Sequence, residues 1–288
     1  MRRTETELVA VDSTPMLVRR FSPDDRDASR TVLIVHGLCE HGERYEHVAR
    51  CLIQYNWNVV VPDLRGHGRS GGVNTHVVNF RHYAHDLEII FSYFRLAPES
   101  TAIVAHSMGG LVALRFAQLF PDRIAALVMT SPLLGIKVSI PRRTIATGKL
   151  MSLVAPRTRF RSRVNPVDTT RNPEALAQRL GDPLIRKSVT AGWYFAMRSA
   201  MAAAWDEAKH VQLPLFIMQA GADRIVDPDA PAEWVKLSGS NDVTLQTLPE
   251  HYHELLNEPD WQQITASIAA WLDRRVASTG PSPQQQSA

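Results

Sequence analysis

Five short runs rich in apolar and β-branched residues recur along the chain, separated by longer and more polar segments. Runs of this length are typical of strands that are buried in a sheet. They cover residues 31–35, 58–61, 101–105, 213–219 and 243–248. Because the segments between them are long enough for helices, the pattern predicts an α/β fold with a mostly parallel central sheet and helices on both faces.

The longer segments carry apolar residues at helical spacing, and two further strands open the chain. Stripes at 48–55, 80–94 and 261–272 predict helices that pack on the sheet. Residues 8–11 and 16–21 predict two strands, which a Pro-containing turn joins into a hairpin. A chain of 288 residues with 44% hydrophobic content can bury a large core, and we expect a single α/β unit.

The run at 101–105 breaks at a serine, and the chain resumes as an apolar helix. Ser107 stands at this break, with the small residues Ala105 and Gly109 on either side. A serine at a sharp strand-to-helix turn exposes its Oγ, and its neighbours must be small because strand and helix nearly touch there. The alternative is that these residues are only the Gly-containing start of a helix, which occurs in α/β proteins without a catalytic serine. We expect Ser107 to be a nucleophile.

A serine hydroxyl needs partners before it can attack a carbonyl carbon. A histidine must take its proton, a carboxylate must orient the histidine, and N–H donors must stabilise the oxyanion. His251 and His253 follow the last strand, and Asp223 and Asp227 follow the strand before it. Asp227 also fits the cap of a helix that begins near Pro228. The chain order is therefore serine, aspartate, histidine, with two candidates for each of the last two positions.

Five motifs between residues 31 and 258 match one known family in combination, although none is specific alone. They are His36-Gly37-x-x-Glu40-His41 with Arg44-Tyr45, Asp63-x-Arg65-Gly66-His67-Gly68-x-Ser70-x-Gly72, His106-Ser107-Met108-Gly109-Gly110, Asp223-Arg224 with Asp227, and Tyr252-His253-Glu254. With these motifs the chain resembles the monoacylglycerol lipase and lysophospholipase branch of the α/β-hydrolases, a group also called serine aminopeptidase-like hydrolases.

The resemblance implies an α/β-hydrolase fold and a serine hydrolase mechanism. It selects His253 as the general base, because this histidine stands in the Tyr-His-Glu motif. It selects Asp223 as the carboxylate that orients the histidine. It also assigns the oxyanion hole to the N–H groups of Leu38, in the loop after the first buried run, and Met108, which follows the nucleophile.

The chain departs from the family pattern at two positions. Ala105 replaces the first glycine of the usual Gly-x-Ser-x-Gly motif, and Cys39 stands where the family usually has a glycine in the oxyanion loop. We expect Cys39 to be an inert small residue that changes the shape of the acyl pocket more than the activity. The only other cysteine is Cys51, so no disulfide framework is expected and a reducing compartment is favoured.

The remaining histidines give no evidence of a metal site. The spacing of His76, His82 and His85 could suit a metal, but no cysteine or acidic cluster completes a ligand set. We therefore expect no metal and no cofactor. His36 and His106 flank the two loops of the site, and we expect them to orient the backbone.

Residues 133–205 do not continue the alternation of strand and helix. The resemblance implies that they form a cap inserted between two parts of the hydrolase core, residues 1–132 and 206–277. Residues 133–164 contain eight Lys and Arg and no Asp or Glu, whereas the whole chain carries a formal charge of +3. Interleaved apolar residues predict peripheral contact with an anionic membrane, although a solvated basic face has a similar composition. No nucleic-acid-binding motif accompanies the charge, and no nucleic-acid partner is expected.

The two ends of the chain are polar. Residues 1–7 mix arginines with glutamates and lead into no apolar stretch of signal length. Residues 278–288 are rich in Pro, Ser and Gln and predict a disordered tail. No apolar run reaches the length of a membrane span. The expected location is therefore cytoplasmic, with any membrane contact peripheral, and the sequence indicates no oligomeric state.

These features predict a serine carboxylester hydrolase that acts on monoacylglycerols, lysophospholipids or similar single-chain esters through an acyl-enzyme. An aminopeptidase, an amidase and a perhydrolase on the same fold are alternatives. A peptidase needs acidic groups to bind the free amine of its substrate, and the basic cap argues against that activity. Dehalogenases and epoxide hydrolases use aspartate where this chain has Ser107. A non-catalytic ligand receptor with a hydrolase fold is the alternative from another class, and it would not turn over p-nitrophenyl butyrate.

Overall fold

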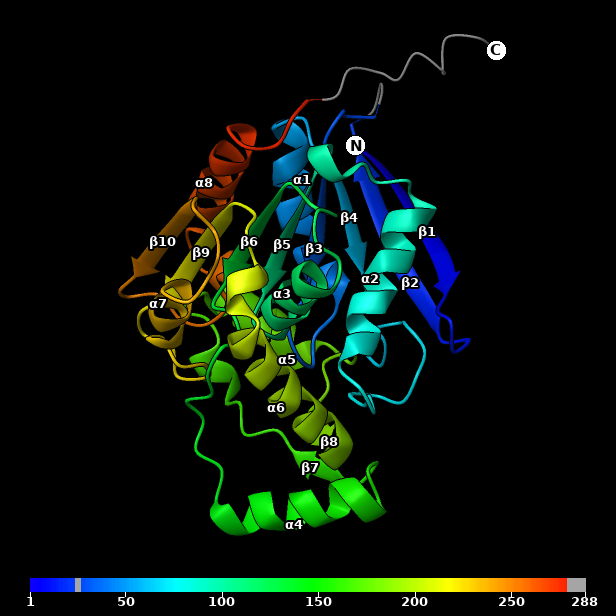
Figure 1. Cartoon of the computed structure of the whole chain (residues 1–288), viewed down its shortest axis with the longest axis vertical. Coiled ribbons are helices and arrows are strands. Elements are labelled where there is room, and N and C mark those ends of the chain that lie inside the picture. The colour runs from blue at the N-terminus through cyan, green and yellow to red at the C-terminus, as the bar shows by residue number, and fades with distance from the viewer. Residues whose placement is uncertain (24–26, 279–288) are drawn as a thin grey trace.

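The centre of the molecule is an eight-stranded sheet with strand order β1-β2-β4-β3-β5-β6-β9-β10 (Figure 1). The structure is a computed structural model and describes residues 1–23 and 27–278. β1 pairs antiparallel with β2 and β2 antiparallel with β4, while all other neighbours in this sheet pair in parallel. The predicted mostly parallel sheet is therefore confirmed.

All five buried runs predicted from the sequence are strands, with ends that shift by at most two residues. The pair β7–β8, which lies outside the main sheet, was not predicted. The strands are β1 Arg2–Val9, β2 Pro15–Ser22, β3 Thr31–Val35, β4 Asn58–Pro62, β5 Thr101–His106, β6 Ala126–Thr130, β7 Arg159–Arg161, β8 Ser188–Thr190, β9 Leu215–Ala220 and β10 Val243–Leu248.

The opening hairpin is present, but its first strand differs from the prediction of 8–11. β1 spans Arg2–Val9 and pairs with β2 along its whole length, from Arg2 opposite Ser22 to Val9 opposite Pro15. Most of β1 is exposed because it is an edge strand of the sheet. A strand with little buried surface carries little hydrophobic periodicity, so the apolar pattern revealed only its end.

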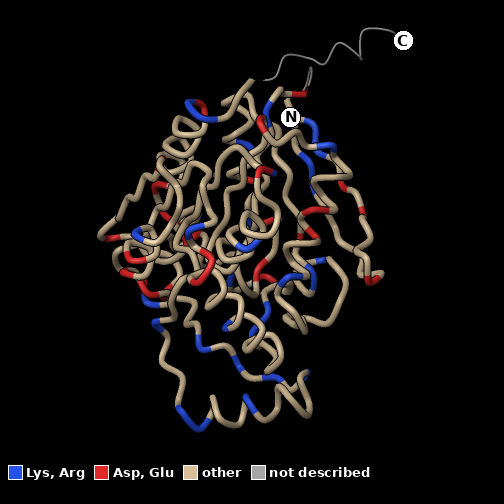
Figure 2. Tube along the Cα trace, viewed as in Figure 1, with Lys and Arg blue, Asp and Glu red and all other residues tan. Residues whose placement is uncertain are grey.

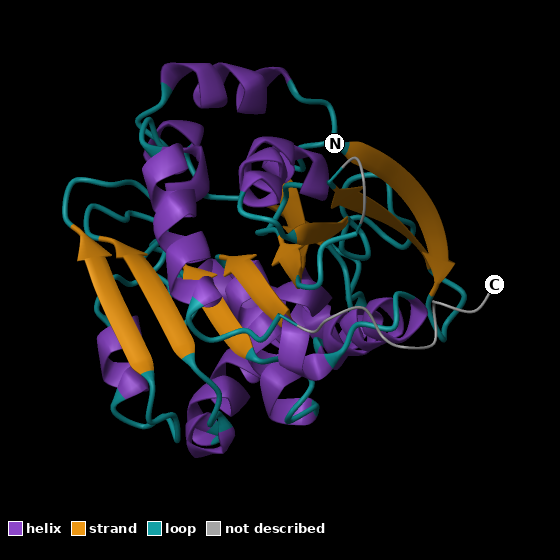
Figure 3. Cartoon of the chain, turned by 90° about the horizontal axis from the view of Figure 1, so that it is seen from above, coloured by secondary structure: helices purple, strands orange, loops and turns teal. Residues whose placement is uncertain are grey.

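Helices cover both faces of the sheet (Figures 1 and 3). α1 and α8 pack together on one face, and α2, α3 and α6 contribute to the core on the other. Of the predicted stripe Val48, Leu52 and Tyr55, the first two face the core, whereas Tyr55 follows the end of α1 and is exposed. The helices are α1 Glu46–Gln54, α2 Arg81–Tyr93, α3 Met108–Leu119, α4 Arg142–Val154, α5 Pro173–Gly181, α6 Ala191–Asp206, α7 Ala230–Val235 and α8 Trp261–Asp273.

The central strands feed two separate cores because successive side chains point to opposite faces. On β5, Ile103 and Ala105 belong to the core beneath α2 and α3, while Ala102 and Val104 belong to the core beneath α1 and α8. All four are fully buried. This two-sided burial explains why the strands read as continuous apolar runs, and it fixes the strand ends that carry the site.

The segment between β6 and β9 contains α4, β7, α5, β8 and α6, and we refer to residues 133–205 as the insertion. It lies at one end of the molecule, with α4 outermost (Figure 1). Basic residues without acidic ones mark α4 in Figure 2. In the part of the chain that the structure describes, no helix is both long and apolar enough to cross a membrane. The disordered tail expected at 278–288 lies outside the described residues from 279 onward.

Candidate active site

Ser107 occupies the sharp turn between β5 and α3. Its dihedral angles are φ 54° and ψ −117°, a conformation that costs a residue with a side chain about 1–3 kcal/mol. The turn is tight because α3 starts against the end of β3, and a Cβ at Gly109 would lie 2.2 Å from the Val35 carbonyl oxygen. Glycine is therefore required at 109. Ala105 lies inside β5, where its methyl group is buried in the core and the missing glycine is not needed.

Three side chains from three strand ends meet in a continuous hydrogen-bonded chain. Ser107 follows β5, Asp223 lies beyond β9 and His253 lies beyond β10. His253 Nε2 lies 2.8 Å from Ser107 Oγ, and His253 Nδ1 lies 2.7 Å from Asp223 Oδ2. All three residues are buried. Parallel strands place their carboxyl ends at one edge of the sheet, so the fold itself brings these residues together.

Asp223 is held as a carboxylate. Its Oδ1 accepts hydrogen bonds from the N–H groups of Ile225, at 2.8 Å, and Val226, at 3.0 Å. Burial raises the pKa of Asp223, but its interaction with His253 and these hydrogen bonds outweigh it, so the pKa lies below its usual value. An ionised carboxylate at this place favours a proton on Nδ1 of His253. Nε2 is then free to accept the proton of Ser107.

The two alternative residues have other partners. His251 Nε2 lies 2.9 Å from Asp260 Oδ2. Asp227 Oδ1 accepts the Asp229 N–H at 3.1 Å, so its side chain closes a turn within the loop. The predicted helix-cap role of Asp227 is wrong, because this turn delays the start of α7 to Ala230 and leaves Asp229 in the cap position.

The two N–H groups expected to form the oxyanion hole flank Ser107. Leu38 lies in the loop after β3 and lines the same pocket as Ser107. Met108 is the first residue of α3, whose N-terminus carries a partial positive charge. Neither N–H donates to an acceptor within residues 1–23 and 27–278. The Gly37 N–H is occupied, because it donates to Glu40 Oε1 at 2.6 Å and thereby fixes the loop.

Cys39 lies in the same loop with a φ of 65°. This left-handed conformation suits glycine and explains why a glycine is expected there. The cysteine side chain is buried, and burial raises the pKa of the thiol to about 12. The thiol is therefore protonated and unreactive at neutral pH, as the sequence suggested.

A buried network of charges connects the Leu38 loop to the His253 loop. Arg44 pairs with Glu40 and, at 2.7 Å, with Glu254, which directly follows His253 in the chain. Arg179 on α5 of the insertion pairs with the other oxygen of Glu254 at 2.6 Å. Burial raises the pKa of Glu254, but the charges of Arg44 and Arg179 outweigh it and hold the pKa below its usual value. The network fixes both loops relative to each other and to the insertion.

His36 and His106 orient the backbone around the site, as predicted. His36 Nε2 accepts the Leu64 N–H at 2.9 Å, which leaves the proton on Nδ1 to bond the Gly37 carbonyl oxygen. His106 Nδ1 donates to the Thr130 carbonyl oxygen at 3.1 Å. Burial lowers the pKa of His106 to about 4, so this histidine is neutral at pH 7.

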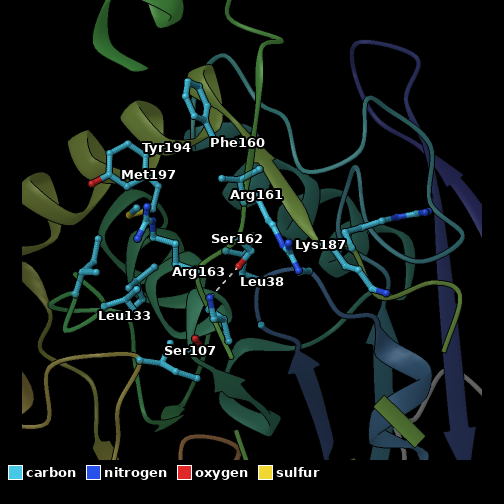
Figure 4. A pocket seen from close by; sticks show the side chains of 18 of the residues that line it. Leu38, Ser107, Leu133, Phe160, Arg161, Ser162, Arg163, Lys187, Tyr194 and Met197 are labelled. Carbon is cyan, nitrogen blue, oxygen red and sulfur yellow. Dashed lines mark hydrogen bonds between the residues drawn. The ribbon is translucent and has the colours of Figure 1, made fainter. Parts of the chain in front are cut away.

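A cavity of about 560 Å³ adjoins Ser107 and extends beneath the insertion (Figure 4). Leu38 and Leu133 lie near the serine in this view, and Phe160, Tyr194 and Met197 lie further out. Most of the wall is apolar, with further contributions from Ile136, Val138, Ile140, Ile145, Val189 and Trp193.

Arg179 is the functional residue of the site that sequence reasoning missed. It lies 75 residues from its partner Glu254 and belongs to no family motif quoted above. Glu40, Arg44 and Glu254 were noted as motif residues, but the sequence gave no reason to connect them. The available signal was that charged residues in a loop which the fold buries must find partners of opposite charge.

A serine, an aspartate and a histidine in this chain order, at the carboxyl ends of parallel strands, define the α/β-hydrolase class of serine hydrolases. Within that class, a family model described as "Serine aminopeptidase, S33" matches residues 26–260. The chain belongs to this family. The resemblance and the fold expected from the sequence are therefore confirmed.

Individual relatives agree with this assignment. The chain is 26% identical to "Phospholipase YtpA" of Bacillus subtilis over 247 aligned residues, and these cover 85% of this chain and 95% of the relative. It is 28% identical to human "Monoglyceride lipase", over 95% of this chain and 91% of the relative. The solved structure of Paleococcus ferrophilus monoacylglycerol lipase superposes with a TM-score of 0.80, at 24% identity, and covers 94% of this chain and 98% of that one. This structural similarity shows the fold.

Proposed function

We propose that the protein hydrolyses carboxylic esters of single-chain lipids, with Ser107 as nucleophile, His253 as general base and acid, and Asp223 orienting the imidazole. The observation that carries the proposal is the hydrogen-bonded chain Ser107–His253–Asp223, with distances of 2.8 and 2.7 Å. The N–H groups of Leu38 and Met108 stabilise the oxyanion. Neither a metal nor a cofactor takes part in these steps.

The reaction proceeds through an acyl-enzyme. Ser107 Oγ attacks the ester carbonyl carbon while His253 Nε2 takes the hydroxyl proton, and the carbonyl oxygen becomes an oxyanion. The bond to the alcohol oxygen then breaks as His253 gives its proton to that oxygen, leaving the acyl group on Ser107. Water gives a proton to His253 and attacks the acyl carbon. The fatty acid leaves when the bond to Oγ breaks and His253 returns the proton to Ser107.

The pocket supports a substrate with one acyl chain. Its volume of about 560 Å³ and its largely apolar wall suit a single chain beside the nucleophile. Relatives named phospholipase and monoglyceride lipase act on lipids with ester bonds, and the family assignment agrees with an ester substrate. Monoacylglycerols, lysophospholipids and similar single-chain esters are the proposed class.

A fluorophosphonate probe tests the nucleophile. We expect it to label Ser107, and Ser107→Ala should lose both labelling and turnover of p-nitrophenyl butyrate while keeping its thermal unfolding transition. Ser162→Ala, which alters a serine on the wall of the same pocket, is the matched control and should keep both. An adduct on another serine, or activity in Ser107→Ala, would contradict the assignment. A wild-type protein without turnover of any ester would point to the non-catalytic receptor.

An aminopeptidase is the second candidate, because the family is named for that activity. A free α-amino group needs an accessible carboxylate. The carboxylates that line the pocket are Glu40 and Glu254, and both are already paired with arginines. Ester hydrolysis is therefore the better fit. Hydrolysis of an aminoacyl p-nitroanilide faster than of p-nitrophenyl butyrate would reverse this preference.

We also propose that residues 133–205 act as a cap and touch anionic membranes through α4. This helix exposes Leu150 and Leu153 beside Arg142, Arg143 and Lys149. Each basic group near an anionic surface contributes about 1 kcal/mol, and the attraction weakens as salt rises.

Sedimentation with vesicles tests the membrane contact. The wild type should bind vesicles that contain phosphatidylglycerol at low salt and release from them at high salt. Arg142→Glu/Arg143→Glu should bind more weakly, whereas Arg81→Glu on α2, which lies outside the insertion, should bind like the wild type. Equal binding of all three proteins, or no binding of the wild type, would mean that the basic residues only solvate the surface.

A further inference from the structure

The wall of the pocket next to Ser107 carries two kinds of residue, and they come from different parts of the insertion. Residues 133–148 contribute only uncharged side chains to the lining, and so does α6. Residues 161–187 contribute five Lys and Arg. The pocket therefore has an apolar wall and a cationic wall.

Four of these five cations form one group, which we call the cationic ribbon: Arg161, Arg163, Arg186 and Lys187. They lie on and beside the antiparallel pair β7–β8, where the Ser162 N–H donates to the Lys187 carbonyl oxygen at 2.9 Å. The ladder therefore holds the two halves of the ribbon side by side. Figure 4 shows Arg161, Arg163 and Lys187 around the same pocket as Ser107.

The cationic ribbon has no anionic partner in the protein. Among residues 1–23 and 27–278, no carboxylate lies within ion-pair distance of any of its four side chains. Nε of Arg186 is buried without a hydrogen-bond partner. An unsatisfied buried donor is unfavourable, and four neighbouring cations repel one another, so the arrangement favours a bound anion.

The ribbon lies close to the reacting ester. The backbone N–H of Arg186 donates to the Cys39 carbonyl oxygen at 2.9 Å, and Cys39 directly follows Leu38 of the proposed oxyanion hole. The pKa of the Cys39 thiol is a second indication that Arg186 lies near the oxyanion loop. Burial raises its pKa, and the positive charges of Arg179 and Arg186 act in the opposite direction.

We propose that the cationic ribbon is an anion subsite that binds the phosphate of a single-chain lysophospholipid, so that the protein prefers phosphorylated substrates to neutral monoacylglycerols. This inference rests on the proposed ester hydrolysis and narrows its substrate class. A phosphate on glycerol is only a few bonds from the acyl ester, which matches the position of Arg186 beside the oxyanion loop. Guanidinium groups bind phosphate oxygens through paired, charge-assisted hydrogen bonds.

A zwitterionic choline head group fits this wall less well than an anionic one. Its quaternary ammonium would lie beside the cations of the ribbon and be repelled by them. The carboxylates of the lining, Glu40 and Glu254, are both occupied by arginines. We therefore expect the protein to prefer substrates whose head group is a phosphate monoester or carries another net negative charge.

Kinetics with two matched substrates test the subsite. 1-Octanoylglycerol and its 3-phosphate share the acyl chain, and both are used below their micelle concentrations, so that no lipid surface is present. The wild type should show a kcat/KM for the phosphorylated substrate about tenfold or more above that for the neutral one. Arg161→Gln/Arg186→Gln should lower this ratio about tenfold, to near one, mainly through KM, because charged hydrogen bonds are lost.

The ratio of the two substrates in the same variant cancels any general loss of folded protein. Lys187→Gln is a second variant, milder because it removes one charge instead of two, and it should lower the ratio in the same direction. Arg143→Gln/Arg157→Gln is the matched control, because it removes two charges from the insertion outside the pocket lining and should keep the wild-type ratio.

Each result decides the question. Equal kcat/KM values in the wild type, or an equal fall of the ratio in the control pair, would overturn the subsite and leave ester hydrolysis intact. Inhibition of octanoylglycerol hydrolysis by inorganic phosphate without a preference for the phosphorylated substrate would also overturn it, since the ribbon would then bind a free anion. Absence of any hydrolysis by the wild type would refute the proposed function itself.

Discussion

Glu254→Gln changes one atom of a side chain yet removes the charge that two arginines share. Glu254 bonds Arg44 at 2.7 Å and Arg179 at 2.6 Å, and its side chain is only 3% exposed. In the wild type the two glutamates and two arginines of the network balance. In the variant one amide N–H₂ group must face a guanidinium, and a positive charge stays buried without its partner.

The expected loss follows from that burial. Breaking a buried ion pair by removing one partner destabilises a protein by about 3–5 kcal/mol, compared with less than about 1 kcal/mol for an exposed pair. The loss depends on pH. Because the pKa of Glu254 is lowered in the folded state, its contribution is complete above the unfolded pKa of about 4.3 and disappears as the pH falls through the folded value. The variant should therefore lose less stability than the wild type as the pH falls below about 5.

Urea unfolding at pH 7 and through this acid range measures both effects. Glu88→Gln is the matched control, since Glu88 forms a partly exposed pair with Arg123 and its loss should cost less than about 1 kcal/mol. In a double-mutant cycle, Arg179→Met should cost less in the Glu254→Gln background than in the wild type. A cost below about 1 kcal/mol for Glu254→Gln, or strictly additive changes with Arg179→Met, would refute the coupled network.

Two further predictions concern the loops of the site. Asp223→Asn should lower kcat for p-nitrophenyl butyrate by roughly four orders of magnitude, because the imidazole loses its orienting charge, whereas Asp227→Asn should lower it less than about tenfold; comparable losses would mean that the carboxylate is misassigned. Cys39→Gly should be about 0.5–1 kcal/mol more stable than Cys39→Ala in urea unfolding. The φ of 65° strains alanine, and this strain exceeds the stability that glycine loses because its unfolded chain is more flexible. A more stable alanine variant would show that the left-handed φ carries no strain.

Much of the fold could be predicted because the parallel strands are buried on both faces. Such strands appear in the sequence as short apolar runs, and their order along the chain fixes which loops meet at the carboxyl edge of the sheet. The sequence therefore allowed us to predict that three residues lie together: Ser107, Asp223 and His253. β1 could be predicted only in part, since its exposed edge carries little periodicity.

Loop conformation and long-range charge pairing could not be predicted in the same way. The turn at Asp227 depends on one side-chain hydrogen bond to Asp229, and this local bond moved the start of α7. The pair β7–β8 has only three residues in each strand, too few for a periodic signal. Arg179 and Glu254 are 75 residues apart, and nothing in either segment indicates the other.

The insertion shows why a count of charges does not locate a binding site. Five Lys and Arg line the pocket, but Arg179 is neutralised by Glu254 and serves to hold the His253 loop. Only cations without a carboxylate partner can turn toward a ligand at little cost, because a paired one must first give up its bond. We therefore assign the proposed anion binding to the cationic ribbon, while the network of Glu40, Arg44, Arg179 and Glu254 holds the loop that carries His253. Substrate choice and catalytic geometry thus rest on different residues of the same insertion and core, and a change in one need not disturb the other.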